Sequence, residues 1–213
     1  MFDKEISGEV PEHRDFIYNK LKPFCENELG IKFTILHAAK TYDDVFHHII
    51  VRGPHQGQKR GFAWPGICTV NRDCKIPPIR KYNASLSPDT ISYVGIAVDE
   101  PVRLARLEGT SKVSLLDKYG LTEADALKLC ADHDLLSPIY GHCRRNGCWF
   151  CPNASDAELR YMIIHHPEMF DRLIEWENEE NVFHRRLTRR ETPTEIKARL
   201  MSKPQPGHSV SKL

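Results

Sequence analysis

Apolar residues follow helical and strand-like spacings along the first part of the chain. Residues 11–29 carry an apolar stripe at helical spacing that is closed by Gly30, which predicts a helix. Residues 31–36 (IKFTIL) are short, apolar and rich in β-forming side chains, which predicts a strand. Thr41 is placed to cap a helix that runs to about residue 51. Residues 71–82 predict a further helix, although Pro77 and Pro78 limit its regularity.

The second half continues this alternation of strands and helices. Residues 91–98 (ISYVGIAV) are almost continuously apolar, which is typical of a parallel strand buried on both faces. Helices are expected from Thr122 to about residue 133, from Ser155 to about 165, from Pro167 to about 180, and from Thr192 through 200. The pattern favours an α/β layer fold, with one domain over residues 1–180 and a basic, partly helical tail over 181–213.

Composition narrows the range of partners. The chain has 213 residues, 40% of them apolar and 28% charged, as expected for a globular protein. The net charge is only +1, so affinity for nucleic acid or phosphate has to come from local patches. We expect no membrane span and no export signal, and therefore a cytoplasmic protein. The sequence leaves open whether the chain forms a homo-oligomer.

The cysteines are the main candidates for chemistry. The stretch Gly147-Cys148-Trp149-Phe150-Cys151-Pro152 is a CxxC motif bounded by turn-forming residues. With the distant Cys68 and Cys74, it supplies the four thiolates that zinc or a 4Fe–4S cluster requires. The alternative is that the spacing is accidental and that some of these thiols are small buried hydrophobes.

Three further cysteines are interpreted separately. Cys143 extends the motif to a C-x4-C-x2-C spacing similar to that of plant-type ferredoxins, so an iron–sulfur cluster remains an alternative to zinc. The sequence leaves open whether Cys143 is a ligand. Cys25 and Cys130 lie on apolar helical stripes, and we expect them in the core.

A second group of candidates follows residues 91–98. Asp99 and Glu100 stand at the carboxyl end of this expected strand, where open α/β sheets place their ligand groups, and Arg103 comes soon after. These side chains could bind a ribose hydroxyl, Mg²⁺ or a phosphate. A carboxylate pair beside an arginine is equally an ordinary surface ion pair.

Basic and aromatic side chains alternate in a glycine- and proline-rich loop over residues 52–68 and in the helix expected after it. They could hold phosphates while an aromatic ring stacks on a base. The residues concerned are Arg52, Lys59, Arg60, Arg72 and Lys75, with Phe62 and Trp64 between them. Residues 182–203 add seven Lys or Arg against two Glu. A solvated loop and a solvated helix face are the commoner explanations.

Several phrases together resemble a known family. MFDKEISGEVPEHRDFI, DCKIPPIRKY, ISYVGIAVDEPVRLARL and LLSPIYGHCRRNGCWFCPN are similar to the phosphoadenosine-phosphosulfate (PAPS) reductase family in its phage and bacterial forms. That family belongs to the PP-loop, or adenine-nucleotide α-hydrolase-like, superfamily. The resemblance covers about residues 1–180, and its most specific parts are GIAxDEPxR and GCWFCP.

The resemblance implies a HUP-type parallel sheet with flanking helices that binds an adenine nucleotide, ATP or PAPS, for sulfur or adenylyl-transfer chemistry. The nucleotide would face Asp99, Glu100, Arg103, Arg60 and Lys75, and Lys75 to Ile79 matches the family's Lys-x-x-Pro-Leu/Ile element. Cys148 and Cys151 match a CxxC that holds a 4Fe–4S cluster in related reductases, and they resemble the GCWxC motif of DNA phosphorothioation proteins. Cys68 and Cys74 stand in place of the adjacent cysteine pair that those reductases use.

The chain departs from the family at its start. The phosphate loop Ser-Gly-Gly-x-Asp-Ser is absent, and residues 1–3 look like the end of the family's second strand. We therefore do not expect this chain alone to hydrolyse ATP, because that loop supplies the backbone N–H groups that hold phosphates. No cysteine follows Cys151, so the catalytic cysteine of thioredoxin-dependent reductases is missing too. The alternative is a non-catalytic, metal-stabilised module that binds nucleic acid or a protein partner.

Overall fold

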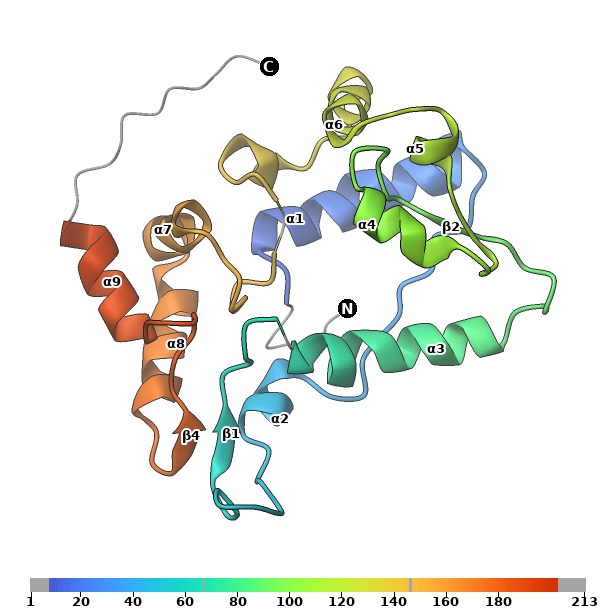
Figure 1. Cartoon of the computed structure of the whole chain (residues 1–213). Coiled ribbons are helices and arrows are strands. Elements are labelled where there is room, and N and C mark those ends of the chain that lie inside the picture. The colour runs from blue at the N-terminus through green and yellow to red at the C-terminus, as the bar shows by residue number, and fades with distance from the viewer. Residues whose placement is uncertain (1–7, 67, 146, 203–213) are drawn as a thin grey trace. The chain divides into compact units, whose positions relative to one another are not determined.

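The computed structural model describes residues 8–66, 68–145 and 147–202 (Figure 1). The α-helices in these ranges are α1 (Pro11–Phe16), α2 (Tyr42–Phe46), α3 (Ile76–Ala84), α4 (Pro101–Leu104), α5 (Leu115–Lys118), α6 (Glu123–Asp132), α7 (Asp156–His165), α8 (Pro167–Asn178) and α9 (Pro193–Ser202). Short π-helical segments are η1 (Ile17–Leu21), η2 (Phe24–Glu28) and η3 (Asn71–Lys75), and 3-10 turns are η4 (Ala105–Leu107) and η5 (Pro138–Gly141). The strands are β1 (Lys59–Gly61), β2 (Ser92–Val94), β3 (Lys112–Ser114) and β4 (Val182–His184).

The chain divides into two compact units. The first contains the described parts of Met1–Arg14, Ile35–Ile79 and Ile139–Leu213, and the second contains Asp15–Thr34 and Arg80–Pro138. Each unit has one pair of parallel strands, β1 with β4 in the first and β2 with β3 in the second. The protein is therefore a mixed α/β protein with small parallel sheets. Its α/β class and parallel pairing agree with the sequence-based prediction.

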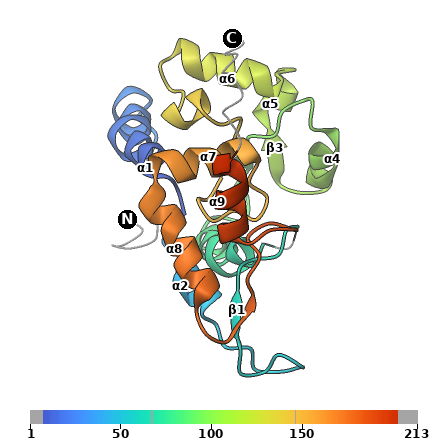
Figure 2. The ribbon, with the colours of Figure 1, turned by 90° about the vertical axis from the view of Figure 1, so that its left-hand side faces the viewer.

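The first unit contains the main hydrophobic core. β1 and β4 lie side by side (Figure 1), with Lys59 opposite Val182 and Gly61 opposite His184. The helices α7, α8 and α9 pack together (Figure 2). The segment that we predicted as a basic tail contributes Leu187, Ile196 and Leu200, each at most 1% exposed. Up to Ser202 this segment therefore belongs to the first unit, because its apolar side chains fill the core.

The second unit is built on β2 and β3, with Ser92 opposite Lys112 and Val94 opposite Ser114. The hydroxyl of Ser114 is buried, donates to the carbonyl oxygen of Ile96 at 2.5 Å, and accepts from the backbone of Asp117 to cap α5. One side chain therefore ties the end of β3 to the segment after β2.

Local capping signals predicted several helix starts, and the structure confirms them. Thr41 with Asp44, Thr122 with Asp125, and Ser155 with Glu158 each form a capping box at the start of α2, α6 and α7. The helical stretch from α1 reaches Glu28 and is followed by Gly30 at φ +63°, as predicted. The helix expected over 71–82 is present as η3 and α3. In each case the signal lies within a few residues of the element that it specifies.

Three predictions of elements are wrong. Residues 31–36 form no strand, because no neighbouring strand pairs with them, and Ile31 is 57% exposed. α2 ends at Phe46 rather than near residue 51, because Ile49 pairs antiparallel with Lys59. The apolar run 91–98 yields only β2, and Tyr93 is 63% exposed because β3 is the only strand paired with β2 among the described residues. The strand expected at residues 1–3 lies outside the described residues.

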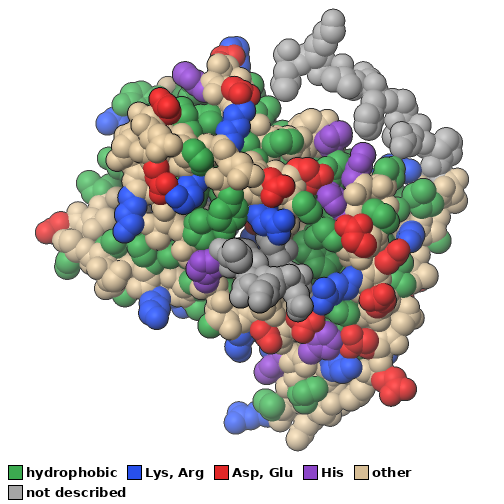
Figure 3. All heavy atoms as spheres, turned by 180° about the vertical axis from the view of Figure 1, so that it is seen from behind, with side chains coloured by type: hydrophobic (Ala, Val, Ile, Leu, Met, Phe, Trp, Pro, Cys, Tyr) green, Lys and Arg blue, Asp and Glu red, His purple; other side chains and the backbone are tan. Residues whose placement is uncertain are grey.

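Positive and negative side chains are mixed on the surface. On the face shown in Figure 3, lysine and arginine side chains are interspersed with aspartate and glutamate, and the net charge of the chain is +1. Within residues 8–66, 68–145 and 147–202, no helix is both long and apolar enough to cross a membrane.

Candidate cysteine centre

The CxxC turn is anchored in the first unit by its two middle residues. Trp149 and Phe150 are 4% and 3% exposed, so both rings lie in the core. The backbone N–H of Cys151 donates to the carbonyl of Cys148 at 2.9 Å, which closes the turn, and Trp149 N donates to the Gly8 carbonyl at 3.1 Å. The motif therefore owes its position to the apolar residues between the cysteines as much as to the flanking Gly147 and Pro152.

Tyr42, at the start of α2, connects this turn to a third cysteine. Its ring stacks on Phe150 with centroids 3.6 Å apart and an interplanar angle of 16°. Burial raises the pKa of the Tyr42 hydroxyl, and the negative charge that nearby cysteines carry when ionised raises it further. These cysteines are Cys68, Cys148 and Cys151. The structure thus brings three of the four predicted ligands close to one buried hydroxyl.

That hydroxyl has no well-formed hydrogen bond within the described part of the chain. It lies near the backbone of Ala63, which opposes the rise in its pKa, but without hydrogen-bond geometry. A buried polar atom without a partner is costly, and an acceptor beside it would remove this cost. Metal-bound thiolate sulfurs are acceptors of this kind. The orphaned hydroxyl therefore suits a centre built on the surrounding cysteines.

Cys68 lies just before the helical stretch whose η3 segment contains Cys74. Cys68 Sγ accepts from the backbone of Asn71 at 3.3 Å, as an N-terminal cap does. Cys74 is buried in η3, and its thiol donates to the Thr41 carbonyl at 3.6 Å. Burial raises the pKa of Cys74, with further contributions from Asp73 and other neighbouring charges, Cys68 among them. The two thiols are neighbours, but Cys74 is committed to a backbone carbonyl in this arrangement.

A basic side chain lies beside each cysteine of the CxxC motif. Lys75 hydrogen-bonds to Cys148, and its Nζ lies 3.8 Å from Glu9. Burial would lower the pKa of Lys75, yet the charges of Cys148 and Glu9 outweigh it and raise the pKa. Burial raises the pKa of Cys148 to about 11 against the opposing charge of Lys75. Without a metal the Cys148 thiol is therefore protonated at neutral pH, and binding a metal would release that proton.

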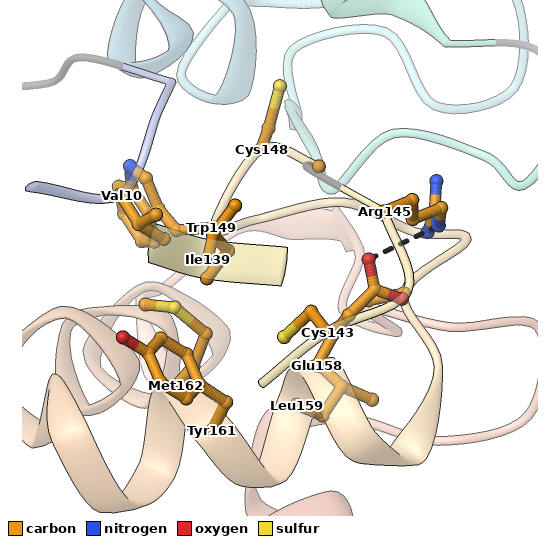
Figure 4. A pocket seen from close by; sticks show the side chains of 12 residues that line it. Val10, Ile139, Cys143, Arg145, Cys148, Trp149, Glu158, Leu159, Tyr161 and Met162 are labelled. Carbon is orange, nitrogen blue, oxygen red and sulfur yellow. Dashed lines mark ion pairs between the residues drawn. The ribbon is translucent and has the colours of Figure 1, made fainter. Parts of the chain in front are cut away.

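Arg145 plays the corresponding part at Cys151. Its Nη2 lies 3.9 Å from Cys151 Sγ, and its Nε lies 3.2 Å from Glu158 Oε1, the ion pair drawn in Figure 4. Glu158 is buried and completes the capping box of α7. The capping box of α7 therefore positions Glu158, and the ion pair with Glu158 positions Arg145 next to the sulfur of Cys151. Sequence analysis missed Arg145 and Tyr42, although the Arg144-Arg145 pair inside the cysteine loop was a usable signal.

Cys143 lines a small pocket with Val10, Ile139 and Met162. Cys148 also borders this pocket, but its sulfur points away from it (Figure 4). Burial raises the pKa of the Cys143 thiol to about 11, and the charge of Glu158 adds to the effect. Of the two cysteines expected in the core, Cys25 is half-buried, and the prediction for Cys130 is wrong because α6 leaves it exposed.

The donor set suits a thiolate-bound metal in its chemistry. Three cysteine thiols lie near the Tyr42 hydroxyl, and a fourth, that of Cys74, is adjacent to Cys68. Lys75 and Arg145 lie where they would offset the negative charge of metal-bound thiolates. Among residues 8–66, 68–145 and 147–202, however, no group of three or more His, Cys, Asp or Glu side chains converges on a single point at metal-binding distances. The assignment of Cys68, Cys74, Cys148 and Cys151 as metal ligands stays a prediction.

The residues predicted at the nucleotide make local contacts. In the second unit, Asp99 Oδ1 accepts from Glu123 N at 3.1 Å at the start of α6, and Glu100 forms an ion pair with Arg103. The Arg103 guanidinium lowers the pKa of Glu100. In the first unit, Arg60 pairs with Asp73 at 3.0 Å. Lys75, predicted to face the nucleotide, lies beside Cys148. These contacts leave nucleotide binding untested.

One predicted stacking residue is excluded by burial. Phe62 is 1% exposed and packs edge-on against Phe46 at 5.0 Å between ring centroids, so it cannot stack on a ligand. Trp64, two residues later, is 52% exposed.

Comparison of the chain with protein families, with curated proteins and with solved structures found no match.

Proposed function

We propose that this chain binds a thiolate-coordinated metal, either a 4Fe–4S cluster or zinc, together with an adenine nucleotide, ATP or PAPS. In this proposal it serves sulfur or adenylyl-transfer chemistry as a relative of the PAPS reductase family, with a HUP-type fold. Cys68, Cys74, Cys148 and Cys151 would hold the metal. A cluster would carry electrons or sulfur, whereas zinc would be structural.

The observation that carries this proposal is the pairing of each CxxC thiol with a cation. Lys75 at Cys148 and Arg145 at Cys151 both have raised pKa values, because neighbouring negative charges outweigh the effect of burial. Buried cysteines that serve only as small hydrophobes have no need of a lysine and an arginine. Four thiolates on a metal carry excess negative charge, and cations beside the sulfurs stabilise it.

The first experiment is anaerobic purification followed by an absorption spectrum and assays for iron, sulfide and zinc. A broad band near about 400 nm with roughly four irons supports cluster-dependent sulfur chemistry. A colourless protein with about one zinc supports a structural centre. A folded protein with neither metal contradicts the proposal.

A second candidate function is a non-catalytic, metal-stabilised module. The observation that favours it is that Asp99, Glu100, Arg103 and Arg60 are already committed to contacts within the chain. The two candidates are separated by thermal unfolding with ATP, PAPS or GTP. A ligand at about one hundred times its Kd adds roughly 2.7 kcal/mol of stability, which is several degrees in melting temperature. A rise with ATP or PAPS but not GTP supports the enzyme-like reading, and no rise with any of them favours the module.

A further inference from the structure

A groove in the first unit combines an exposed aromatic ring with several arginine side chains. It has a volume of about 570 Å³, and its lining includes Trp64, Phe183, His184, Arg185, Arg186 and Arg189. Trp64 comes from the loop after β1, and the others come from β4 and the segment that follows it. The parallel pairing of β1 with β4 brings these two distant parts of the chain together.

Trp64 is held as a fixed platform. Its ring stacks on His184 with centroids 4.1 Å apart and an interplanar angle of 15°. His184 is itself buried, and its Nδ1 lies 2.9 Å from the carbonyl oxygen of Phe62. Because His184 covers one face of the indole and the residue is still 52% exposed, the outer part of the ring faces solvent. A rigid, exposed indole offers a stacking surface at little entropic cost.

The arginines beside Trp64 differ in what they contact. Arg185 donates to the carbonyl oxygens of Glu177 and Glu179, so its role is structural. Arg186 and Arg189 are exposed, and neither has a side-chain hydrogen bond or ion pair within the described part of the chain. The nearest acid in sequence, Glu191, is held by Arg199 at 2.6 Å. The groove therefore presents two uncompensated guanidinium groups.

The basic surface continues beyond the groove. A neighbouring hollow of about 430 Å³ shares Pro65 and Arg189 with it and adds Arg190, together with Asp156 and Glu191, whose carboxylates both pair with Arg199. Charged groups spaced along a continuous surface suit a chain of phosphates better than one phosphate. A double helix hides the faces of its bases, whereas a single strand can place a base on an aromatic ring.

We propose that this surface binds single-stranded nucleic acid, with one base stacked on Trp64 and phosphodiester groups at Arg186 and Arg189. The site does not depend on the cysteine centre and goes beyond the function proposed above. It combines Trp64 and Pro65 of the loop over residues 52–68 with the basic segment over residues 182–203 that the sequence also indicated. The loop's Arg60 and Lys59 are occupied by Asp73 and Glu179.

The experiment measures fluorescence anisotropy of a labelled thymidine oligonucleotide of about 15 nucleotides, a length that fills a typical single-strand site. The full chain as purified is used throughout. Binding should weaken with salt, with a slope near −1.4 for about two phosphate contacts on a single strand. Trp64→Ala should weaken binding about tenfold or more, whereas Trp64→Phe should retain most of it because a ring remains.

Arg186→Ala combined with Arg189→Ala should weaken binding and reduce the salt slope by about 1.4. The matched control combines Arg80→Ala and Arg106→Ala, which remove the same charge from exposed positions in the second unit. Trp149 and Trp176 are both 4% exposed, so quenching of tryptophan fluorescence by the oligonucleotide reports mainly on Trp64. Circular dichroism and melting temperature confirm that each variant is folded.

Three outcomes would overturn the proposal. The first is equal binding by wild type, Trp64→Ala and the double arginine variant. The second is equal affinity for duplex DNA of the same length, since a duplex offers no free base to stack. The third is competition by ATP as effective, molecule for molecule, as by the oligonucleotide. The metal assay is independent of all three, so failure of this site and failure of the cysteine centre are distinguishable.

Discussion

Gly61 and His184 approach each other more closely than any side chain at position 61 would allow. A Cβ atom at Gly61 would stand 2.2 Å from the carbonyl oxygen of His184, and the backbone there has φ +83°. This contact lies in the β1–β4 ladder, at the point where His184 supports Trp64. Glycine at this position is therefore what allows the loop from β1 and the basic segment after β4 to meet.

Gly61→Ala should destabilise the protein by about 3 kcal/mol or more, since it adds left-handed backbone strain to a steric clash. Gly57→Ala is the matched control, because Gly57 has φ +85° but nothing within 4 Å of its Cβ position. It should cost only about 1 kcal/mol. Urea unfolding of both variants measures the difference. Equal costs would mean that the approach to His184 is not tight in solution.

Cys148→Ser should lose bound metal and lower the melting temperature by about 10 °C or more, because metal binding is folding free energy. Cys130→Ser is the control, since Cys130 is exposed on α6. Metal analysis and thermal unfolding of the two variants make the comparison. A Cys148→Ser protein that melts like wild type would contradict the idea that the cysteines hold the first unit together.

Lys75→Met tests whether Lys75 serves the cysteines or a nucleotide. If it offsets thiolate charge, metal retention under a chelator should fall about tenfold, while any shift in melting temperature by ATP is unchanged. Lys81→Met, on the exposed part of α3, is the control and should change neither. Loss of the ATP response with metal retained would instead restore Lys75 to the nucleotide site that the family resemblance implies.

How far the sequence predicted this structure depends on the range of each signal. The capping residues Thr41, Thr122 and Ser155 act within three positions, so the helix starts were predictable. The apolar run 31–36 has strand propensity, but a strand also needs a partner, which local propensity cannot supply. The pairing of Gly61 with His184 joins segments far apart in the chain, so no local pattern revealed it.

The same reasoning applies to the candidate site. The CxxC motif identified Cys148 and Cys151 because its spacing is a local property. Tyr42 and Arg145 reach those sulfurs through tertiary packing, Tyr42 by stacking on Phe150 and Arg145 by its ion pair with Glu158. Neither contact can be read from the sequence, although Arg144-Arg145 places basic side chains next to the motif. Phe62 and Trp64 looked equivalent in the sequence, and only the burial of one and the exposure of the other distinguishes them.

A final prediction concerns pH and the carboxylate of Glu179, which connects α2 to β1. Its Oε2 lies 2.9 Å from His47 Nε2 and 2.9 Å from Lys59 Nζ. Burial would raise the pKa of Glu179, but the hydrogen bonds and charges of His47 and Lys59 outweigh it and hold the pKa below its ordinary value. A carboxyl whose pKa is lower in the folded state stabilises the protein above its unfolded pKa. That contribution is lost as the pH falls through the folded value.

Glu179→Gln should therefore cost about 1 kcal/mol at neutral pH, a figure that allows for the partial exposure of the ion pair. The difference from wild type should shrink below about pH 4.5, because Glu179 of the unfolded wild-type chain takes up a proton there while the folded carboxylate still resists it. Glu180→Gln is the control, since Glu180 is exposed and adjacent in sequence. Release of metal by acid affects both variants alike, so urea unfolding of the two proteins across this range isolates Glu179. A Glu179→Gln cost that does not change with pH would show that the carboxylate acts through packing rather than charge.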